Sequence, residues 1–215
     1  MDSRSTGLIL RTRLLTETSL IVHWLTRDLG RIATVAKGAR RQKSPFRGKL
    51  DLFYLADFSF ARSSKSDLHS LREVALIETH PALRRNLDLL QQAAYGAALI
   101  EQTTEIETPV PEVHDLMLAL LRHLSTQPLG TETVYAFELK LLDQLGLKPD
   151  LDAASLSPGA RRIAEQMLHI EWSALARLKP GANQSTELRR FLHGFLIYHL
   201  SKIPKGRRAA LLAGD

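Results

Sequence analysis

The sequence predicts a two-domain protein in which a small, closed, five-stranded β-barrel precedes an α-helical domain. Hydrophobic and polar residues alternate in short runs through residues 6–79, and from there hydrophobic residues recur at helical spacing. The dipeptide His80-Pro81 separates the two patterns, because proline disfavours helix before it and tolerates helix after it. We therefore expect one domain at residues 1–80 and a second at residues 81–215.

Five short strands are expected in the first domain. Alternating or continuous hydrophobic runs place them at residues 7–15, 19–26, 31–37, 50–61 and 69–79. The second run is nearly all apolar, which indicates burial on both faces. The fourth alternates, with Leu52, Tyr54 and Phe58 on one face. Five strands in about 75 residues favour a closed barrel over a sandwich.

Helices are expected throughout the second domain. Leucine and alanine recur at helical spacing from Leu83 to about residue 107, and residues 113–124 follow the i, i+3, i+4, i+7 pattern of an amphipathic helix. Gly146 is the expected C-cap of a third helix, and Ser157 the expected N-cap of a fourth. A last strong helix is predicted around residues 188–195.

The composition narrows the class of protein. With 44% hydrophobic and 24% charged residues, the chain is typical of a soluble globular protein. It contains no cysteine, which excludes disulfides, thiolate metal ligands and a cysteine nucleophile. The sequence has neither a run approaching the roughly 18 apolar residues of a membrane span nor the apolar region of a signal peptide. A cytoplasmic location is expected.

All of the net positive charge falls in the first domain. Residues 1–80 contain 14 Lys and Arg against 8 Asp and Glu, whereas residues 81–215 contain 15 of each. Seven basic residues and no acidic residue lie between Arg31 and Lys49. Such a run repels itself unless an anion neutralises it, so it indicates a site for a polyanion. A solvated basic loop without a partner is the alternative that the charge run alone leaves open.

The candidate nucleic-acid-binding residues are the basic side chains of this stretch and of the first strand, together with one aromatic ring. Phe46 is the expected stacking residue, because it lies in a polar loop where burial in the barrel is least expected. The other aromatic residues of the domain are expected to fill the core. The complete set is Arg11, Arg13, Arg31, Lys37, Arg40, Arg41, Lys43, Phe46, Arg47 and Lys49.

No motif indicates catalysis. The chain lacks the GxxxxGK[ST], GxGxxG and GxSxG patterns, and its eight histidines are scattered without HExxH spacing. The acidic residues Glu101, Glu105 and Glu107 near a helix end are interpreted as a solvated face. We therefore expect no catalytic residue, no metal site and no enzymatic activity.

Several segments carry a family resemblance, chief among them Val35-Ala-Lys-Gly-Ala-Arg-Arg41, Ser44-Pro-Phe-Arg-Gly48 and Phe137-Glu-Leu-Lys-Leu-Leu-Asp-Gln-Leu-Gly146. In these the chain resembles the bacterial RecO family of recombination mediators, over nearly its whole length. The resemblance implies an oligonucleotide-binding (OB) barrel, binding of single- and double-stranded DNA, annealing of complementary strands and a nucleoid-associated location. It also implies contact with the acidic tail of single-strand binding protein, and partnership with RecR in loading RecA.

The chain departs from that family in one segment. Many members carry a four-cysteine zinc site after the third helix, but residues 147–156 contain no cysteine. Zinc is therefore not expected, no other cofactor is implied, and packing must hold this segment. An acidic tail with an apolar end needs an apolar groove flanked by cations. Arg84, Arg122 and Lys140 are the candidate flanking residues.

The expected mechanism is neutralisation of phosphates along one face of the barrel, which gives affinity without sequence preference. Annealing would then need no nucleotide hydrolysis. Two other classes of protein remain possible on the residues alone. An RNA-binding barrel of the translation machinery predicts a preference for RNA. An adaptor whose basic loop binds an acidic protein surface predicts negligible affinity for DNA.

Overall fold

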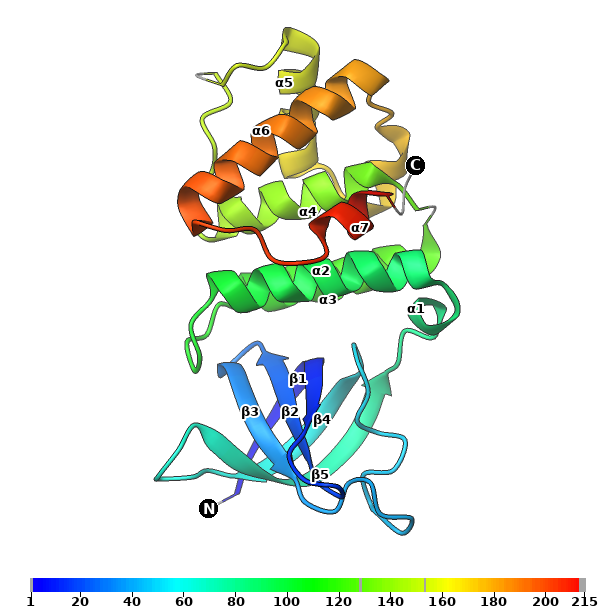
Figure 1. The fold of residues 1–215 in the computed structure, drawn as a ribbon, viewed down its shortest axis with the longest axis vertical. Coiled ribbons are helices and arrows are strands. Elements are labelled where there is room, and N and C mark those ends of the chain that lie inside the picture. The colour runs from blue at the N-terminus through cyan, green and yellow to red at the C-terminus, as the bar shows by residue number, and fades with distance from the viewer. Residues whose placement is uncertain (1, 128, 153, 213–215) are drawn as a thin grey trace. The chain divides into compact units, whose positions relative to one another are not determined.

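The computed structural model describes residues 2–127, 129–152 and 154–212. The chain divides into two compact units (Figure 1). The barrel unit comprises Met1–His80 and Thr104–Asp115, and the helical unit comprises Pro81–Thr103 and Leu116–Asp215. The chain thus leaves the barrel unit after residue 80 and returns to it for a short second segment. Hydrophobic periodicity alone does not indicate this return.

Within the described residues, the strands of the barrel unit are β1 (Asp2–Leu14), β2 (Leu20–Thr26), β3 (Gly30–Ala36), β4 (Leu55–Ala61) and β5 (Leu68–Glu78). They close in the order β1-β2-β3-β5-β4. The pairing between β3 and β5 is parallel, and the other pairings are antiparallel. This arrangement confirms the predicted five-stranded OB barrel.

Aromatic rings fill the barrel, as the sequence predicts for most of them. The rings of Trp24 and Phe58 stack with their centroids 4.0 Å apart, and the ring of Phe60 follows at 5.7 Å from that of Phe58. The indole N–H of Trp24 donates to the hydroxyl of Thr34 at 2.8 Å, so its polar atom is satisfied inside the core. Large, hydrogen-bonded side chains therefore specify the interior of this small barrel.

The fourth strand is shorter than expected, because residues 50–54 form turns and β4 begins at Leu55. Phe53 has a left-handed backbone, with φ of 63°, and its N–H donates to the carbonyl of Ile9 at 2.8 Å. The N–H of Ile9 in turn donates to the carbonyl of Tyr54 at 2.9 Å. Phe53 is thereby buried and Leu52 exposed, which reverses the alternation predicted for this stretch.

The second segment of the barrel unit, Thr104–Asp115, is fastened to the start of β3. The guanidinium of Arg31 donates to the hydroxyl of Thr104 at 2.8 Å, and the carbonyl of Arg31 accepts from the N–H of Glu107 at 2.9 Å. Gly30 has a φ of 69°, and a Cβ placed there would lie 2.3 Å from the carbonyl oxygen of Thr108. Glycine is therefore required where this segment crosses the barrel.

The helical unit contains α1 (Ala82–Arg85), α2 (Leu87–Thr103), α3 (Pro111–Thr126, of which Leu116 onward belongs here), α4 (Thr131–Gln144), α5 (Pro158–His169), a 3-10 helix (Trp172–Arg177), α6 (Ala182–Leu200) and α7 (Arg207–Leu212). The predicted caps are present: Ser157 accepts from the N–H of Ala160 at the start of α5, and Gly146 follows α4 with a φ of 72°.

A buried ion pair holds α7 in the helical unit. The guanidinium of Arg207 donates to both carboxylate oxygens of Glu138 on α4, at 2.7 and 2.8 Å, and Glu138 is fully buried. The hydroxyl of Tyr95 on α2 donates to the same carboxylate at 2.5 Å. Burial and the adjacent carboxylate raise the pKa of Tyr95 far above its usual range. The three side chains join α2, α4 and α7.

Candidate nucleic-acid interface

The basic loop, residues 37–49, is built from successive tight turns. Backbone N–H groups of Arg41, Ser44 and Arg47 each donate to the carbonyl three residues earlier, at 3.0 to 3.2 Å. Gly38 and Gly48 adopt left-handed conformations, with φ of 66° and 73°. The loop is therefore ordered, and it presents exposed side chains of Lys37, Arg40, Arg41, Lys43 and Arg47.

Phe46 lies in the barrel core, and the expectation that it escapes burial is wrong. Only 6% of the residue is exposed, and it belongs to the same buried cluster as Trp24 and Phe58. A polar loop of this length needs an apolar anchor to hold its turns against the barrel, and this ring supplies it. Too little of the ring is exposed for it to act as a stacking platform in this structure.

Three arginines of the basic loop surround a small hollow of about 390 Å³. Arg40, Arg41 and Arg47 line it above an apolar floor, and the described lining residues include no Asp or Glu. The guanidinium of Arg47 donates to the carbonyl of Gln42 at 3.2 Å, which fixes its direction. The apolar floor is formed by Leu20, Ala39, Phe46 and Leu50. A hollow of this chemistry suits a phosphate group with an apolar neighbour.

The basic side chains of β1 lie on the outer face of the barrel beside β2. Arg11 pairs with His23 and Arg13 pairs with Ile21 in the strand register. Burial, and then the positive charges of Arg11, Arg13 and Arg31, lower the pKa of His23 to about 4. Burial is the larger cause of this shift, and the three arginines add positive charge near the same strand face.

Two of the predicted residues are engaged elsewhere. The guanidinium of Arg31 is bonded to Thr104, as described above, so the structure uses this side chain to fasten a segment of the fold. The ammonium of Lys49 donates to the carbonyl of Val74 on β5 at 3.1 Å and is half-buried. Arg31 and Lys49 are therefore engaged in contacts within the fold, whereas the other basic residues of the loop and Arg13 are exposed.

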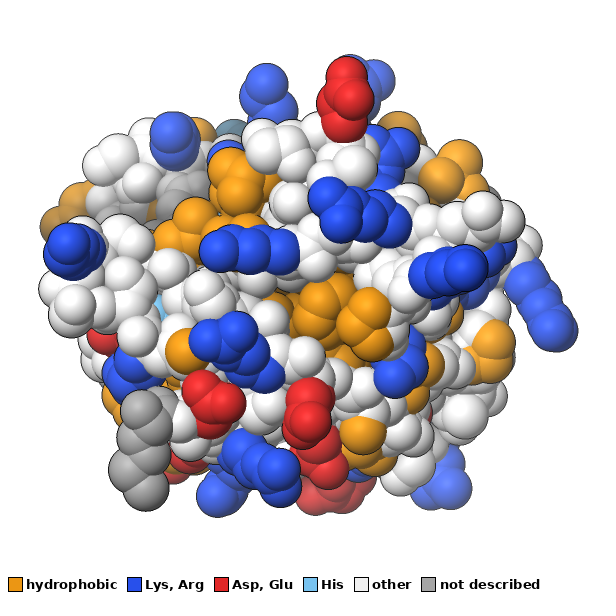
Figure 2. Space-filling model, turned by 90° about the horizontal axis from the view of Figure 1, so that it is seen from below, with side chains coloured by type: hydrophobic (Ala, Val, Ile, Leu, Met, Phe, Trp, Pro, Cys, Tyr) orange, Lys and Arg blue, Asp and Glu red, His pale blue; other side chains and the backbone are white. Residues whose placement is uncertain are grey.

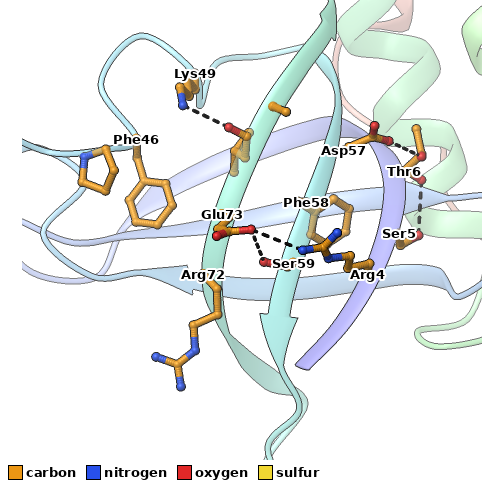
Figure 3. A pocket seen from close by; sticks show the side chains of 13 residues that line it. Arg4, Ser5, Thr6, Phe46, Lys49, Asp57, Phe58, Ser59, Arg72 and Glu73 are labelled. Carbon is orange, nitrogen blue, oxygen red and sulfur yellow. Dashed lines mark hydrogen bonds and ion pairs between the residues drawn. The ribbon is translucent and has the colours of Figure 1, made fainter. Parts of the chain in front are cut away.

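A larger groove, of about 680 Å³, lies between Lys49, Phe46 and the outer surfaces of β1, β4 and β5 (Figure 3). It carries both signs of charge. Arg4 approaches Glu73 at 3.8 Å, and the hydroxyl of Thr6 donates to Asp57 at 2.5 Å. Carboxylates repel phosphates, so this groove is a poorer phosphate site than the hollow in the basic loop. Sequence reasoning missed Arg4 because it lies far from the basic stretch.

Basic side chains outnumber acidic ones on the face of the molecule shown in Figure 2. Seen from below in Figure 2, basic side chains are spread widely, with hydrophobic side chains between them, whereas acidic side chains are fewer and gather mainly towards the lower edge of the view. This mixture of cations and apolar patches is typical of surfaces that contact nucleic-acid backbones and bases together.

The helical unit has a groove of its own, of about 960 Å³, bordered by α4, α6 and α7. Arg189, Arg190 and Arg208 are exposed there, and the described lining residues include no Asp or Glu. Apolar side chains, among them Ile203, Pro204 and Leu211, contribute part of the remaining surface, together with hydroxyl groups such as that of Ser185. The groove therefore fits an anionic ligand with apolar parts.

The three candidate flanking residues of the helical unit lie outside this groove. Arg84 on α1 and Arg122 on α3 are exposed. Lys140 on α4 is half-buried, and its ammonium donates to the carbonyl of Leu168 at 2.9 Å. Burial lowers the pKa of Lys140, against the opposing pull of nearby carboxylates. Sequence spacing missed Arg189 and Arg208 because only the fold brings α6 and α7 together.

The segment between α4 and α5 is held by apolar packing and by polar contacts. Throughout the described ranges, no group of three or more His, Cys, Asp or Glu side chains is placed to hold a metal ion. Leu151 and Leu156 are buried instead, and the guanidinium of Arg161 donates to Asp152 at 3.1 Å. Packing and a hydrogen-bonded ion pair hold this segment. Among the described helices, none is long and apolar enough to cross a membrane.

Comparison with known proteins identifies the family to which this chain is similar. Residues 1–80 match the family described as "Recombination protein O N terminal", and residues 84–155 match "Recombination protein O C terminal". A DNA repair protein RecO of Bacillus pumilus is 34% identical over 149 residues, which are 69% of this chain and 57% of the relative. That of Rhodopirellula baltica is 34% identical over 66% of this chain and 53% of the relative. The matched part thus spans less than two thirds of either relative's length.

Proposed function

This chain belongs to the recombination protein O family, and we propose that it serves DNA repair by binding single- and double-stranded DNA through its barrel unit. The observation that supports this most directly is the hollow lined by Arg40, Arg41 and Arg47 without an acidic neighbour among its described residues. Arg11 and Arg13 on β1 add positive charge to the same unit. These cations contact phosphates, and phosphate contacts carry no sequence information.

Annealing follows from the same contacts. Two complementary strands repel each other through their phosphates, and a protein that neutralises those charges lowers the barrier to pairing. The base edges stay available, because the arginines and lysines hold the backbone. Such a mechanism needs no nucleotide hydrolysis and no cofactor, so the proposed activity is mediation and not enzymatic catalysis.

The proposal extends to protein partners through the helical unit. Family membership favours cooperation with RecR in loading RecA, and contact with the acidic tail of single-strand binding protein. The groove with Arg189, Arg190 and Arg208 supports the second contact, because it combines cations with an apolar surface. Arg84, Arg122 and Lys140 remain the alternative set of flanking residues for that tail.

The DNA-binding proposal is tested by measuring fluorescence anisotropy of labelled single-stranded DNA over a range of salt concentrations, with matched RNA as competitor. Neutralisation of about four to six phosphates predicts that log K falls with log salt at a slope of roughly −3 to −4. A preference for RNA would favour a role in translation. No binding at low salt would favour an adaptor for an acidic protein surface.

The proposed binding of the acidic tail in the groove of the helical unit is tested with a synthetic acidic peptide that has the sequence of the end of single-strand binding protein. Reversing two charges in the groove, with Arg189→Glu and Arg190→Glu, is expected to abolish peptide binding. The matched control reverses two exposed charges outside it, with Arg84→Glu and Arg122→Glu, and is expected to retain binding. The opposite pattern would move the site to the flanking residues predicted from sequence.

A further inference from the structure

The hairpin tip that joins β1 to β2, residues 14–19, carries two adjacent exposed leucines. Leu14 is 65% exposed and Leu15 is 46% exposed. A single exposed leucine is ordinary on a protein surface. Two in succession leave apolar surface on both faces at the end of the hairpin, and a ligand that covers it would remove its contact with water.

The hairpin tip is rigid enough to present these side chains in one arrangement. The N–H of Leu15 donates to the carbonyl of Ser19 at 3.0 Å, which extends the strand pairing beyond β1. The N–H of Ser19 donates to the hydroxyl of Thr16 at 3.1 Å, and this bond closes the turn. Because side chains alternate along a paired strand, Leu14 and Leu15 lie on opposite faces of the hairpin.

The hairpin tip is also bonded directly to the basic loop. The N–H of Arg40 donates to the carbonyl of Thr18 at 3.0 Å, and its guanidinium donates to the carbonyl of Glu17 at 3.0 Å. The N–H of Gly38 donates to the hydroxyl of Ser19 at 3.3 Å. The two leucines are thus held at a fixed position beside the proposed phosphate-binding arginines.

The charges around the hairpin tip favour one kind of occupant. Arg13 lies next to the leucines on β1, and Arg40 is bonded to the tip from the other side, so an anionic chain is attracted to the vicinity. Glu17 is exposed on the tip itself and disfavours a phosphate there. A polyanion that passes the tip therefore presents its uncharged groups to the leucines. In a nucleic acid those groups are the sugars and the bases, and of the two the bases have flat, apolar faces that suit leucine side chains.

We propose that Leu14 and Leu15 form an apolar wedge that contacts the faces of unpaired bases while the basic loop holds the adjoining phosphates. This inference rests on the proposed DNA-binding function and adds to it a determinant of strand preference. The faces of unpaired bases are open, whereas in a duplex they are covered by stacking. An apolar wedge between successive bases therefore stabilises a single strand more than an intact duplex.

The test compares the variant Leu14→Ser with Leu15→Ser against the unaltered chain, on labelled single-stranded and blunt duplex DNA over a range of salt concentrations. The matched control is Leu76→Ser with Ile77→Ser, which removes two adjacent residues of β5 that are 39% and 54% exposed. Circular dichroism and thermal unfolding verify that both variants fold.

The wedge variant is expected to bind single strands at least about five-fold more weakly, a ratio that corresponds to about 1 kcal/mol. Duplex affinity and the salt slope are expected to stay unchanged, because no cation is removed. The control variant should bind both ligands normally. Unchanged single-strand affinity, or an equal loss for single strands and duplex, would overturn the wedge. Failure of the unaltered chain to bind any DNA would instead overturn the proposed function.

Protein docking is the competing use of the hairpin tip. A variant that binds both forms of DNA normally but loses association with a protein partner would assign the leucines to that partner and overturn the wedge. Annealing gives a second readout. Strand annealing by the wedge variant is expected to slow at protein concentrations that saturate the duplex but leave single strands partly free.

Discussion

The two units of this protein differ in how they place some of their basic residues. In the helical unit, Arg207 is buried in a bidentate pair with Glu138, and Lys140 donates to a backbone carbonyl. In the barrel unit, Arg40 and Arg41 are exposed around a hollow whose described lining residues include no acid. The barrel unit therefore exposes arginines around a hollow, whereas the helical unit uses its buried Arg207 to hold the fold together.

This difference shows that the net charge of a unit is a poor guide to where it can bind an anion. The position of each charged side chain is a better guide. Residues 81–215 carry equal numbers of basic and acidic residues, yet Arg189, Arg190 and Arg208 share one groove without an acid among its described residues. In the barrel unit, the groove of Figure 3 contains Glu73 and Asp57 despite the excess of basic residues. Local pairing decides which cations are available to an anion.

The largest expected effect comes from breaking the buried pair of the helical unit. The substitution Glu138→Gln leaves the guanidinium of Arg207 buried without its counter-charge, and we expect a loss of about 3–5 kcal/mol in the free energy of unfolding. Urea denaturation measures this loss. The double substitution Glu138→Met with Arg207→Met should lose less than the single one. An equal or greater loss in the double variant would show that the attraction within the pair, and not the cost of leaving Arg207 buried without a counter-charge, accounts for the lost stability.

A smaller effect is expected where Thr104–Asp115 crosses the barrel. The substitution Gly30→Ala combines a left-handed backbone with a Cβ placed 2.3 Å from the carbonyl of Thr108, and should cost about 2–4 kcal/mol. Gly48→Ala is the matched control, because Gly48 has a similar φ of 73° with nothing within 4 Å of the added Cβ. It should cost only about 1 kcal/mol. Equal losses of unfolding free energy in the two variants, measured by urea denaturation, would show that Thr104–Asp115 moves aside to accommodate the added Cβ at little cost.

A pH effect is expected from His23 on the strand face. Its pKa of about 4 in the folded chain lies below the ordinary histidine value of 6.5, so the unfolded chain takes up the proton first as the pH falls. The contribution of His23 to stability is therefore complete above about pH 6.5 and is lost progressively towards pH 4. The substitution His23→Gln should flatten this part of the stability profile, as thermal unfolding between pH 4 and 7 would show.

Bound DNA should reduce the lowering of the His23 pKa. Phosphates near His23 raise its pKa, so binding takes up a proton and single-strand affinity increases as the pH falls from about 6.5 towards 4. The substitution His23→Gln should reduce this increase. An unchanged pH dependence of binding in the variant would place the phosphates away from the strand face.

Much of the fold follows from local pattern. The five strands are visible in alternation, and Ser157 and Gly146 mark helix ends through their own chemistry. The conformation of residues 50–54 is not visible in this way. The left-handed Phe53 is stabilised by a hydrogen bond to Ile9, which lies 44 residues earlier in the chain, and such a non-local contact leaves no periodic trace in the sequence.

The candidate site divides in the same manner. A basic run between glycines predicts an exposed loop, and Arg40, Arg41 and Arg47 meet that expectation. Phe46 is buried instead, because its ring anchors the loop in the core. Its polar neighbours in the sequence give no sign of this. Arg31 and Lys49 are bonded to distant carbonyls. Only the fold shows that the leucines of the β1–β2 hairpin lie beside the basic loop.

The most direct test of this comparison removes two exposed arginines from each unit in turn and measures the salt dependence of single-stranded DNA binding. One variant carries Arg40→Gln and Arg41→Gln, and the other carries Arg189→Gln and Arg190→Gln, so both lose the same charge. If the barrel unit binds the phosphates, the first variant loses about 1.4 from the magnitude of the salt slope and the second loses nothing. Equal losses in both variants would contradict the division of roles between the two units.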